Sequence, residues 1–590
     1  MTTVMTKKRA DSKSKVTKAV KTEESKPAEP QFRVTAEQLA EKQREISVSE
    51  FFAKNRHLLG FDNPTRALLT AVKEAVDNSL DACEETGILP DLIIKIEQKA
   101  EERFKISIED NGPGIVKAQI PNIFGKLLYG SKFHTLKMSR GQQGIGISAA
   151  GLYGQLTTGK PIVITSRTSP KKPAHYYEII IDTNKNEPVV VKDEEVEWKK
   201  DHGTKVELEL EARYVKGGKS VDDYIKQTAL ANPHTTIIYT PPPTLPKGDA
   251  KNTANGETAT KNDNKKTDEK TKNENKKLEE NNNAVPTTIV YKRSTNKLPI
   301  EPKAIKPHPY GVELGNLMKI LQSSKARQVS RCLQLEFSRV SPAVAKEICT
   351  KANIAENSSP HRIAREEAEK LYKAIQETKI MSPPTNCISP IGEEEIKRGL
   401  KASINAAFYE AVTRSPAVYR GNPFLVEVGL AYGIENYPQE ELATLNRYAN
   451  RVPLLYQQGA CAITKAVIGT DWKRYGLQQS RSALPTAQML LMVHLASVWV
   501  PFTSEAKEAI ASYPEIIREI ELGLQECGRR LYTFLRKKEA AAYEAKRRSI
   551  FELYIEELAT SLNNLVKCGK ENVKKDLVAI AKKATKAGEI

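Results

Sequence analysis

Two segments of the chain lack the apolar residues that a folded core requires, and they divide its 590 residues into three blocks. Residues 1–35 are rich in Lys, Ser, Thr, Glu and Pro, and residues 247–284 are mostly Lys, Asn, Glu, Asp and Thr. Such segments bury too little apolar surface to offset the conformational entropy lost on folding. We therefore expect a disordered basic tail, a disordered insert, and ordered chain over 36–246, 285–385 and 386–590.

Length and charge set the first expectations about the class of protein. At about 150 residues per domain, the chain should contain three or four domains. The net charge of +18 and the pI near 9.2 make a nucleic acid a candidate partner. Much of the basic excess lies in the tail and in residues 529–590. We therefore expect loose contact with DNA phosphates and no reading of bases.

Local composition argues against a membrane or secreted protein. The longest near-continuous apolar run, residues 489–502, contains His494 and Pro501 and is too short to span about 30 Å of bilayer, so it predicts a buried strand. The basic residues at the N-terminus are not followed by the apolar segment of a signal peptide. The seven cysteines include no CxxC pair, which favours a reducing cytoplasm over a disulfide framework or a zinc site.

The first ordered block is predicted to form an α/β sandwich. Asn63 followed by Pro64 is a favourable helix start, and Gly87 is a favourable stop. Later runs have the β-branched or alternating apolar pattern of strands. These runs are residues 91–98, 104–109, 161–166, 176–181 and 205–210.

Three local patterns in this block are candidates for chemistry, and the first is a polar helix face. Glu74, Asn78 and Asp81 stand at i, i+4 and i+7. A carboxylate there can polarise a water molecule, and an amide oxygen can bind Mg²⁺. The alternative is an ordinary solvated helix face.

The other two patterns are rich in glycine. Asp110 ends a predicted strand and precedes Gly112 and Gly114, so it can accept a hydrogen bond from an exocyclic amine while the backbone closes on a base; the alternative is a tight loop. Residues 140–148, RGQQGIGIS, precede a predicted helix, and their bare amides can cradle phosphates. This spacing differs from the Rossmann fingerprint and from a P-loop.

In this order, the three patterns resemble the N, G1 and G2 boxes of the GHKL ATPases, the Bergerat-fold family that includes gyrase-type subunits, Hsp90, MutL and histidine kinases. The resemblance implies ATP and Mg²⁺ as cofactors, with Glu74 as general base, Asn78 as metal ligand and Asp110 as the adenine-reading residue. The other residues that it implies at the nucleotide are Asp81, Gly112, Gly114, Ser131, Lys132, Arg140, Gly141, Gln142, Gln143, Gly144, Ile145, Gly146, Ile147 and Thr204.

The rest of the chain resembles one branch of that family, the B subunits of DNA topoisomerase VI. Helical runs within 303–385 resemble its helix-two-turns-helix insert, and residues 446–467, 471–477 and 497–516 resemble its transducer domain. The implied fold is α+β and multidomain. Its parts are a tail (1–35), a GHKL sandwich (36–246), the insert (247–284), the end of the ATPase domain with the helix-two-turns-helix domain (285–385), an α/β transducer (386–513) and a long stalk helix with a partner-binding tail (514–590).

Lys507 is the transducer residue of most interest. It follows a predicted strand and a Pro-Phe-Thr-Ser turn, and we expect it to open a helix, where the helix dipole disfavours a cation. The resemblance implies that it reaches the γ-phosphate and has a catalytic role. The alternative is an ordinary solvated lysine.

The function implied by the resemblance is that of the ATP-hydrolysing subunit of a type IIB DNA topoisomerase. Such a subunit dimerises on ATP, joins a DNA-cleaving A subunit in a heterotetramer, and gates one duplex through a break in another in the cytoplasm, at the nucleoid. The chain has no D-x-D motif for the metal of a cleavage site, so we expect no cutting by this chain alone.

Three other members of the family are alternatives. An Hsp90-type chaperone and a MutL-type DNA clamp would share the nucleotide site, but the helical insert and the transducer segments count against both. A histidine kinase needs a phospho-acceptor histidine on a helical hairpin before the ATP domain, and only His57 precedes it.

Overall fold

The structure is a computed structural model that describes residues 39–41, 43, 45–132, 135–141, 144–243, 287–438, 440–504, 506–567 and 569–584. The expected disordered tail and insert lie outside these residues. Residues 1–46 and 47–590 form separate units, and the architecture below is that of the second.

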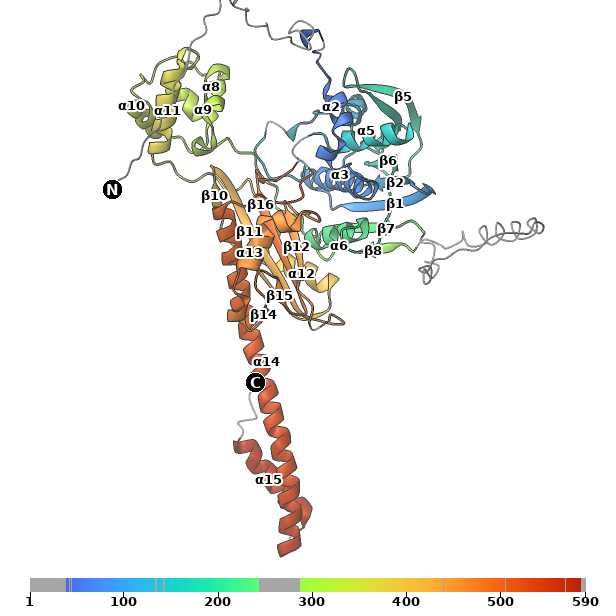
Figure 1. The fold of residues 1–590 in the computed structure, drawn as a ribbon, viewed down its shortest axis with the longest axis vertical. Coiled ribbons are helices and arrows are strands. Elements are labelled where there is room, and N and C mark those ends of the chain that lie inside the picture. The colour runs from blue at the N-terminus through green and yellow to red at the C-terminus, as the bar shows by residue number, and fades with distance from the viewer. Residues whose placement is uncertain are drawn as a thin grey trace, which may run out of the picture. The chain divides into compact units, whose positions relative to one another are not determined.

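The first layer of this unit is a mixed eight-stranded sheet in the order β5-β4-β3-β6-β2-β1-β7-β8 (Figure 1). Neighbouring strands are antiparallel except for β1 and β7. The strands are β1 (Asp91–Ala100), β2 (Arg103–Glu109), β3 (Ile162–Arg167), β4 (Ala174–Asp182), β5 (Glu187–Val196), β6 (Gly203–Glu211), β7 (Thr236–Thr240) and β8 (Ile289–Tyr291). All five predicted strands form, and β5, β7 and β8 are additional.

Helices cover one face of this sheet. Burial alternates along β1 and β2, as expected when one face meets a core and the other meets solvent. The helices are α2 (Val48–Lys54), α3 (Pro64–Glu85), α4 (Ile120–Gly125), α5 (Gly146–Thr158) and α6 (Val221–Ala231). The side chains of α3, α5 and α6 share one apolar core with the strands, so the predicted α/β sandwich is confirmed.

The boundaries of α3 follow from its sequence. The side chain of Asn63 accepts a hydrogen bond from the backbone N–H of Arg66 at 2.9 Å, and Pro64 occupies the first turn, where its missing N–H costs nothing. The helix ends just before Gly87, which has a left-handed φ of 72°. Its apolar side, including Leu68, Val72 and Val76, is buried on the sheet, and this leaves the polar side for other contacts.

Four helices follow within residues 303–385, where the sequence predicts helical runs, and they pack around a core of their own. It consists of α8 (Leu314–Ser323), α9 (Val329–Glu336), α10 (Pro342–Ala352) and α11 (Arg365–Glu377).

The second sheet has the order β10-β11-β16-β12-β13, with β9 also paired to β11. Its strands are β9 (Ala406–Thr413), β10 (Ala417–Tyr419), β11 (Asn422–Ile434), β12 (Thr444–Ala449), β13 (Val452–Pro453) and β16 (Met489–Ser497). The central strands are buried on both faces, since α12 (Glu393–Ser403) covers one face and α13 (Ala462–Gly469) and α14 cover the other.

Two expectations for the region after β16 need correction. The predicted buried strand over 489–502 ends at Ser497. Lys507 does not open a helix: it lies in a loop with a φ of 54°, and the next helix begins at Pro514. The isolated bridge between Phe502 and Ile510 folds this loop back on itself, so the chain cannot continue directly into a helix.

The chain ends in a 53-residue helix, α14 (Pro514–Val566), followed by α15 (Lys570–Ala584). The long helix expected at the start of 514–590 is present. Among the described residues, no helix combines the length and the apolar character needed to cross a membrane.

Gly528 shows how closely α14 packs on the second sheet and its loops. A β-carbon at Gly528 would stand 2.5 Å from the ring of Tyr475. Glycine inside a helix normally costs about 0.5–1 kcal/mol relative to alanine, so here close packing outweighs helix propensity.

We therefore expect Gly528→Ala to lower the free energy of unfolding by about 1–3 kcal/mol through overpacking. Gly315→Ala, in α8 with nothing within 4 Å of the new methyl group, is the matched control and should raise it by about 0.5–1 kcal/mol. Calorimetry measures the stability change of each variant. Equal shifts in the free energy of unfolding for the two variants would contradict this account of the packing.

Candidate active site

A pocket of about 570 Å³ lies between α3, the first turn of α5, the sheet and a loop of the second sheet's domain. Its volume is in the range of pockets that hold a small ligand. Thirteen of the residues predicted from the sequence line it: Glu74, Asn78, Asp110, Gly114, Ser131, Lys132, Gly141, Gly144, Ile145, Gly146, Ile147, Thr204 and Lys507. Residues separated by more than 400 positions are thus brought to one cavity.

Glu74 faces two elements across the pocket. Its Oε1 atom lies 3.7 Å from Nζ of Lys507, and a β-carbon on Gly146 would overlap its carboxylate. Glycine at the start of α5 therefore leaves the Glu74 carboxylate in this position, since a β-carbon there would displace it. This arrangement places a carboxylate, a lysine and a helix N-terminus around one small volume. There the carboxylate can take a proton from water, and the lysine and the helix N-terminus can stabilise negative charge on a ligand.

The loop that carries Lys507 is fastened to α3 on both sides of the lysine. Nζ of Lys73 donates to the carbonyl oxygen of Ala506 at 3.3 Å. Arg66 pairs with Glu508, whose other oxygen accepts a hydrogen bond from Nε2 of Gln457 at 2.8 Å. Lys507 itself is 5% exposed and has a left-handed backbone, so this loop holds it in a fixed place.

Asp77 lies behind Glu74 on the same helix and is buried. Burial raises the pKa of Asp77 to about 6, against the opposing charge of Lys73. Burial also lowers the pKa of Lys73, and the positive charge of Lys507 adds to that effect. The hydroxyl of Tyr224 donates to Asp77 Oδ1 at 3.1 Å, so this carboxyl supports the helix and does not line the pocket.

Asp110 is fixed at the back of the pocket by three hydrogen bonds. Its Oδ1 accepts from the backbone N–H groups of Gly112 at 2.9 Å and Thr204 at 3.0 Å, and its Oδ2 accepts from the hydroxyl of Ser79 at 2.9 Å. Burial raises the pKa of Asp110, although these hydrogen bonds oppose the rise. A buried acceptor held in one orientation selects a ligand that carries an N–H donor.

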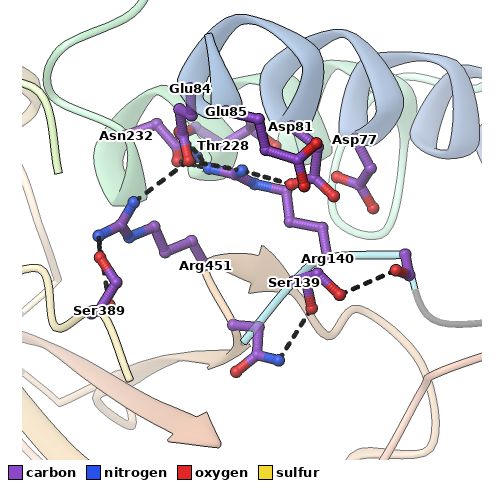
Figure 2. A network of polar contacts seen from close by, with 12 residues as sticks. Asp77, Asp81, Glu84, Glu85, Ser139, Arg140, Thr228, Asn232, Ser389 and Arg451 are labelled. Carbon is purple, nitrogen blue, oxygen red and sulfur yellow. Dashed lines mark hydrogen bonds and ion pairs between the residues drawn. The ribbon is translucent and has the colours of Figure 1, made fainter. Parts of the chain in front are cut away.

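Asp81 and Arg140 do not line the pocket and instead form a buried ion-pair cluster beside it (Figure 2). Arg140 donates to Asp81 Oδ1 at 2.8 Å and to both oxygens of Glu84, at 2.6 and 2.9 Å. Although burial favours the neutral acid, the charge of Arg140 and a hydrogen bond from His234 hold the pKa of Glu84 well below its usual range. Lys132 lines the pocket and also pairs with Asp81.

Gly112 also lies outside the lining, since it serves as a backbone donor to Asp110. Gln142 and Gln143 lie outside the described residues.

Several residues of this region were missed by reasoning from the sequence. Glu84 follows Asp81 by one helical turn, so its place on the same face could have been read from the spacing. The other missed residues contribute only through contacts made in the folded chain, so no pattern in the sequence indicates them. They are Lys73, Arg66, Glu508 and Arg451.

The donor set fits a magnesium site of the kind that uses few protein ligands. Among the described residues, no group of three or more His, Cys, Asp and Glu side chains could hold a metal ion. Asn78 lines the pocket with one amide oxygen, and Mg²⁺ is commonly bound by one or two protein oxygens together with water and ligand phosphates.

Two family models match the two halves of this site. Residues 66–204 match the histidine kinase-, DNA gyrase B- and HSP90-like ATPase family, and residues 383–547 match the transducer of the topoisomerase VI B subunit. The predicted fold class, an α+β multidomain chain with a GHKL α/β sandwich and a transducer domain, is confirmed.

Curated relatives extend the match along most of the chain, and several are named as the B subunit of type 2 DNA topoisomerase 6. The protein of that name from Methanosarcina acetivorans is 46% identical over 90% of this chain and 79% of its own length. The Archaeoglobus fulgidus protein is 48% identical over 84% of this chain and 75% of its own. The Pyrococcus horikoshii protein is 36% identical over 92% of this chain and 96% of its own. By identity and coverage, the chain belongs to the family of type 2 DNA topoisomerase 6 B subunits.

Proposed function

We propose that this chain is the ATP-binding and ATP-hydrolysing subunit of a type IIB DNA topoisomerase, with ATP in the pocket beside α3. One observation carries the proposal: Glu74, Asp110 and Lys507, from distant parts of a chain of this family, line a single pocket that the first turn of α5 closes. The transducer match favours this function over an Hsp90-type chaperone or a MutL-type clamp.

Adenine would bind at Asp110. The fixed carboxylate accepts a hydrogen bond from the exocyclic amine, and Thr204 lies beside it. Gly114 lines the same pocket, and glycine is required there because a β-carbon would overlap the carbonyl group of Arg167. Gly112 would act through its hydrogen bond to Asp110.

The phosphates would lie at the N-terminus of α5, where free backbone N–H groups and the helix dipole favour an anion. The residues proposed to surround them are Ser131, Lys132, Gly141, Gln142, Gln143, Gly144, Ile145, Gly146 and Ile147. Arg140 and Asp81 would hold this segment from outside the pocket, since both lie in the neighbouring ion-pair cluster.

Hydrolysis would use Glu74 as general base. Glu74 takes a proton from the water whose oxygen attacks the γ-phosphorus, the bond to the β-phosphate oxygen breaks, and ADP leaves. Lys507 would turn from Glu74 to the γ-phosphate and oppose its charge. Asn78 would hold Mg²⁺, which neutralises phosphate charge when bound.

The partners proposed for this chain are double-stranded DNA, a DNA-cleaving A subunit, and a second copy of the chain that dimerises with it on ATP binding. In the resulting heterotetramer, ATP would gate strand passage in the cytoplasm at the nucleoid. We propose 36–246 and the start of 285–385 as the ATPase domain, 386–513 as the transducer and 514–590 as the stalk and partner-binding tail. The exposed Leu553, Tyr554 and Leu565 of α14 support an interaction surface at that end.

Replacing the proposed base separates hydrolysis from binding. We expect Glu74→Ala to lower ATP turnover by at least about 10²-fold, the usual contribution of a general base, while the Kd for ATP changes little. Glu102→Gln, at an exposed carboxylate outside the pocket lining, is the control. ATP turnover and supercoil relaxation with a candidate A subunit measure the effect, and wild-type turnover in Glu74→Ala would reject the assignment.

Replacing the proposed adenine acceptor should weaken binding itself. In Asp110→Asn an amide replaces a charged acceptor, so we expect the Kd for ATP to rise by about 10- to 100-fold, the loss of one charge-assisted hydrogen bond. Glu97→Gln, a carboxylate of β1 that pairs with Lys95 and Lys99 outside the pocket lining, is the control. Calorimetric titration with ATP gives both constants, and an unchanged affinity in Asp110→Asn would exclude this orientation of the base.

A further inference from the structure

The turn between β12 and β13 has an unusual backbone. Ala449 pairs with Val452, so Asn450 and Arg451 form a two-residue turn, with φ values of 49° and 67°. Such a turn favours glycine at its second position, because a side chain with positive φ is strained. The chain instead has an arginine there, and a residue held in a strained conformation points to a use for its side chain.

The side chain of Arg451 joins elements that are distant in sequence (Figure 2). It is 4% exposed, its Nη1 lies 3.5 Å from Glu84 on α3, and its Nη2 donates to the hydroxyl of Ser389 and to the carbonyl oxygen of Pro390, at 3.0 and 3.1 Å. Its backbone N–H donates to Nε2 of His494 in β16 at 2.9 Å. One residue of the second sheet thus contacts α3 and the segment that leads into α12.

The adjacent Asn450 adds a contact with the segment that leads to the pocket. Its Nδ2 donates to the carbonyl oxygen of Ser139 at 2.9 Å, and its Oδ1 accepts from the backbone N–H of Ser497 at 2.9 Å. Ser139 immediately precedes Arg140, which is paired to Glu84. Asn450 therefore contacts the chain just before the glycines that line the pocket, and Arg451 is linked to Arg140 through the shared Glu84.

The carboxylate of Glu84 contacts two guanidinium groups, which lie at different distances from it. Arg140 approaches its carboxylate at 2.6 Å, whereas Arg451 stands at 3.5 Å. In a buried cluster the strength of one ion pair depends on the position of the next charge. When bound phosphates shift Arg140 relative to Glu84, Arg451 can close on Glu84 and move the turn.

We propose that Arg451 is a positioning residue that passes movement of Arg140 to the second sheet through Glu84. This inference rests on the proposed ATP site. It adds a second route between nucleotide and transducer, separate from Lys507, since Arg451 does not line the pocket.

The test is hydrogen exchange of the full chain with and without a non-hydrolysable ATP analogue and Mg²⁺. In the wild type we expect nucleotide to slow exchange at residues 144–147 and to change it several-fold at residues 444–453. In Arg451→Lys the first effect should remain and the second should disappear, because one ammonium cannot bridge Glu84 and Ser389 as a guanidinium does. Arg414→Gln, which breaks the transducer pair with Glu519, is the control and should behave as the wild type.

Glu84→Gln is the second variant and should show the same loss, so the test does not depend on one substitution folding. This inference alone would be overturned if nucleotide still changed the exchange rate at residues 444–453 in either variant. It would also be overturned if nucleotide protected residues 144–147 of the wild type but left the exchange rate at 444–453 unchanged. No protection at 144–147 in the wild type would overturn the proposed ATP site and the inference with it.

Discussion

Carboxylates along α3 meet cations that come from other parts of the chain, and this row of charge pairs organises the whole site. Near the middle of the helix Glu74 faces Lys507, and near its end Glu84 faces Arg140 and Arg451. The three cations Lys507, Arg140 and Arg451 are buried, and removing one partner of a buried pair typically costs about 3–5 kcal/mol. The helix can hold them because its apolar side is anchored on the sheet, so its polar side keeps a fixed direction.

This arrangement gives the second sheet's domain two places at which it touches α3. At the first, Lys73 and Arg66 hold the loop of Lys507 against the pocket. At the second, the strained turn at Arg451 meets Glu84 outside the pocket. His494 of β16 lies against the backbone of Arg451, and burial lowers the pKa of this histidine. Its neutral ring accepts at Nε2 from the backbone N–H of Arg451 and donates from Nδ1 to Glu427. Movement at the second contact would therefore reach the centre of the second sheet through His494.

Much of the fold and the pocket could be predicted from the sequence, because the signals were local. The Asn63-Pro64 start, the alternating strands and the glycines before α5 each depend on a few neighbouring residues. The family resemblance then implied that these local patterns belong to one nucleotide site. It also placed Asp81 and Arg140 at the nucleotide, whereas their side chains complete the ion-pair cluster beside the pocket.

What could not be predicted depends on contacts between distant residues. The loop of Lys507 was expected to open a helix, but the Phe502–Ile510 bridge and the pairing of Glu508 with Arg66 give it another form. Arg451 carries no local sign of its role, since its positive φ and its contact with Glu84 exist only in the folded chain. Burial raises the pKa of Asp77, whereas on the same helix the charge of Arg140 and the hydrogen bond from His234 outweigh burial and lower the pKa of Glu84.

The most direct test of the central claim, that α3 places ATP between Asp110 and Lys507, is a structure of the chain with a non-hydrolysable ATP analogue and Mg²⁺. We predict the adenine amine at Asp110, Mg²⁺ at Asn78, and Nζ of Lys507 about 3 Å from a γ-phosphate oxygen. A nucleotide whose base lies away from Asp110, or a Lys507 that stays on Glu74 without touching the phosphate, would contradict this claim.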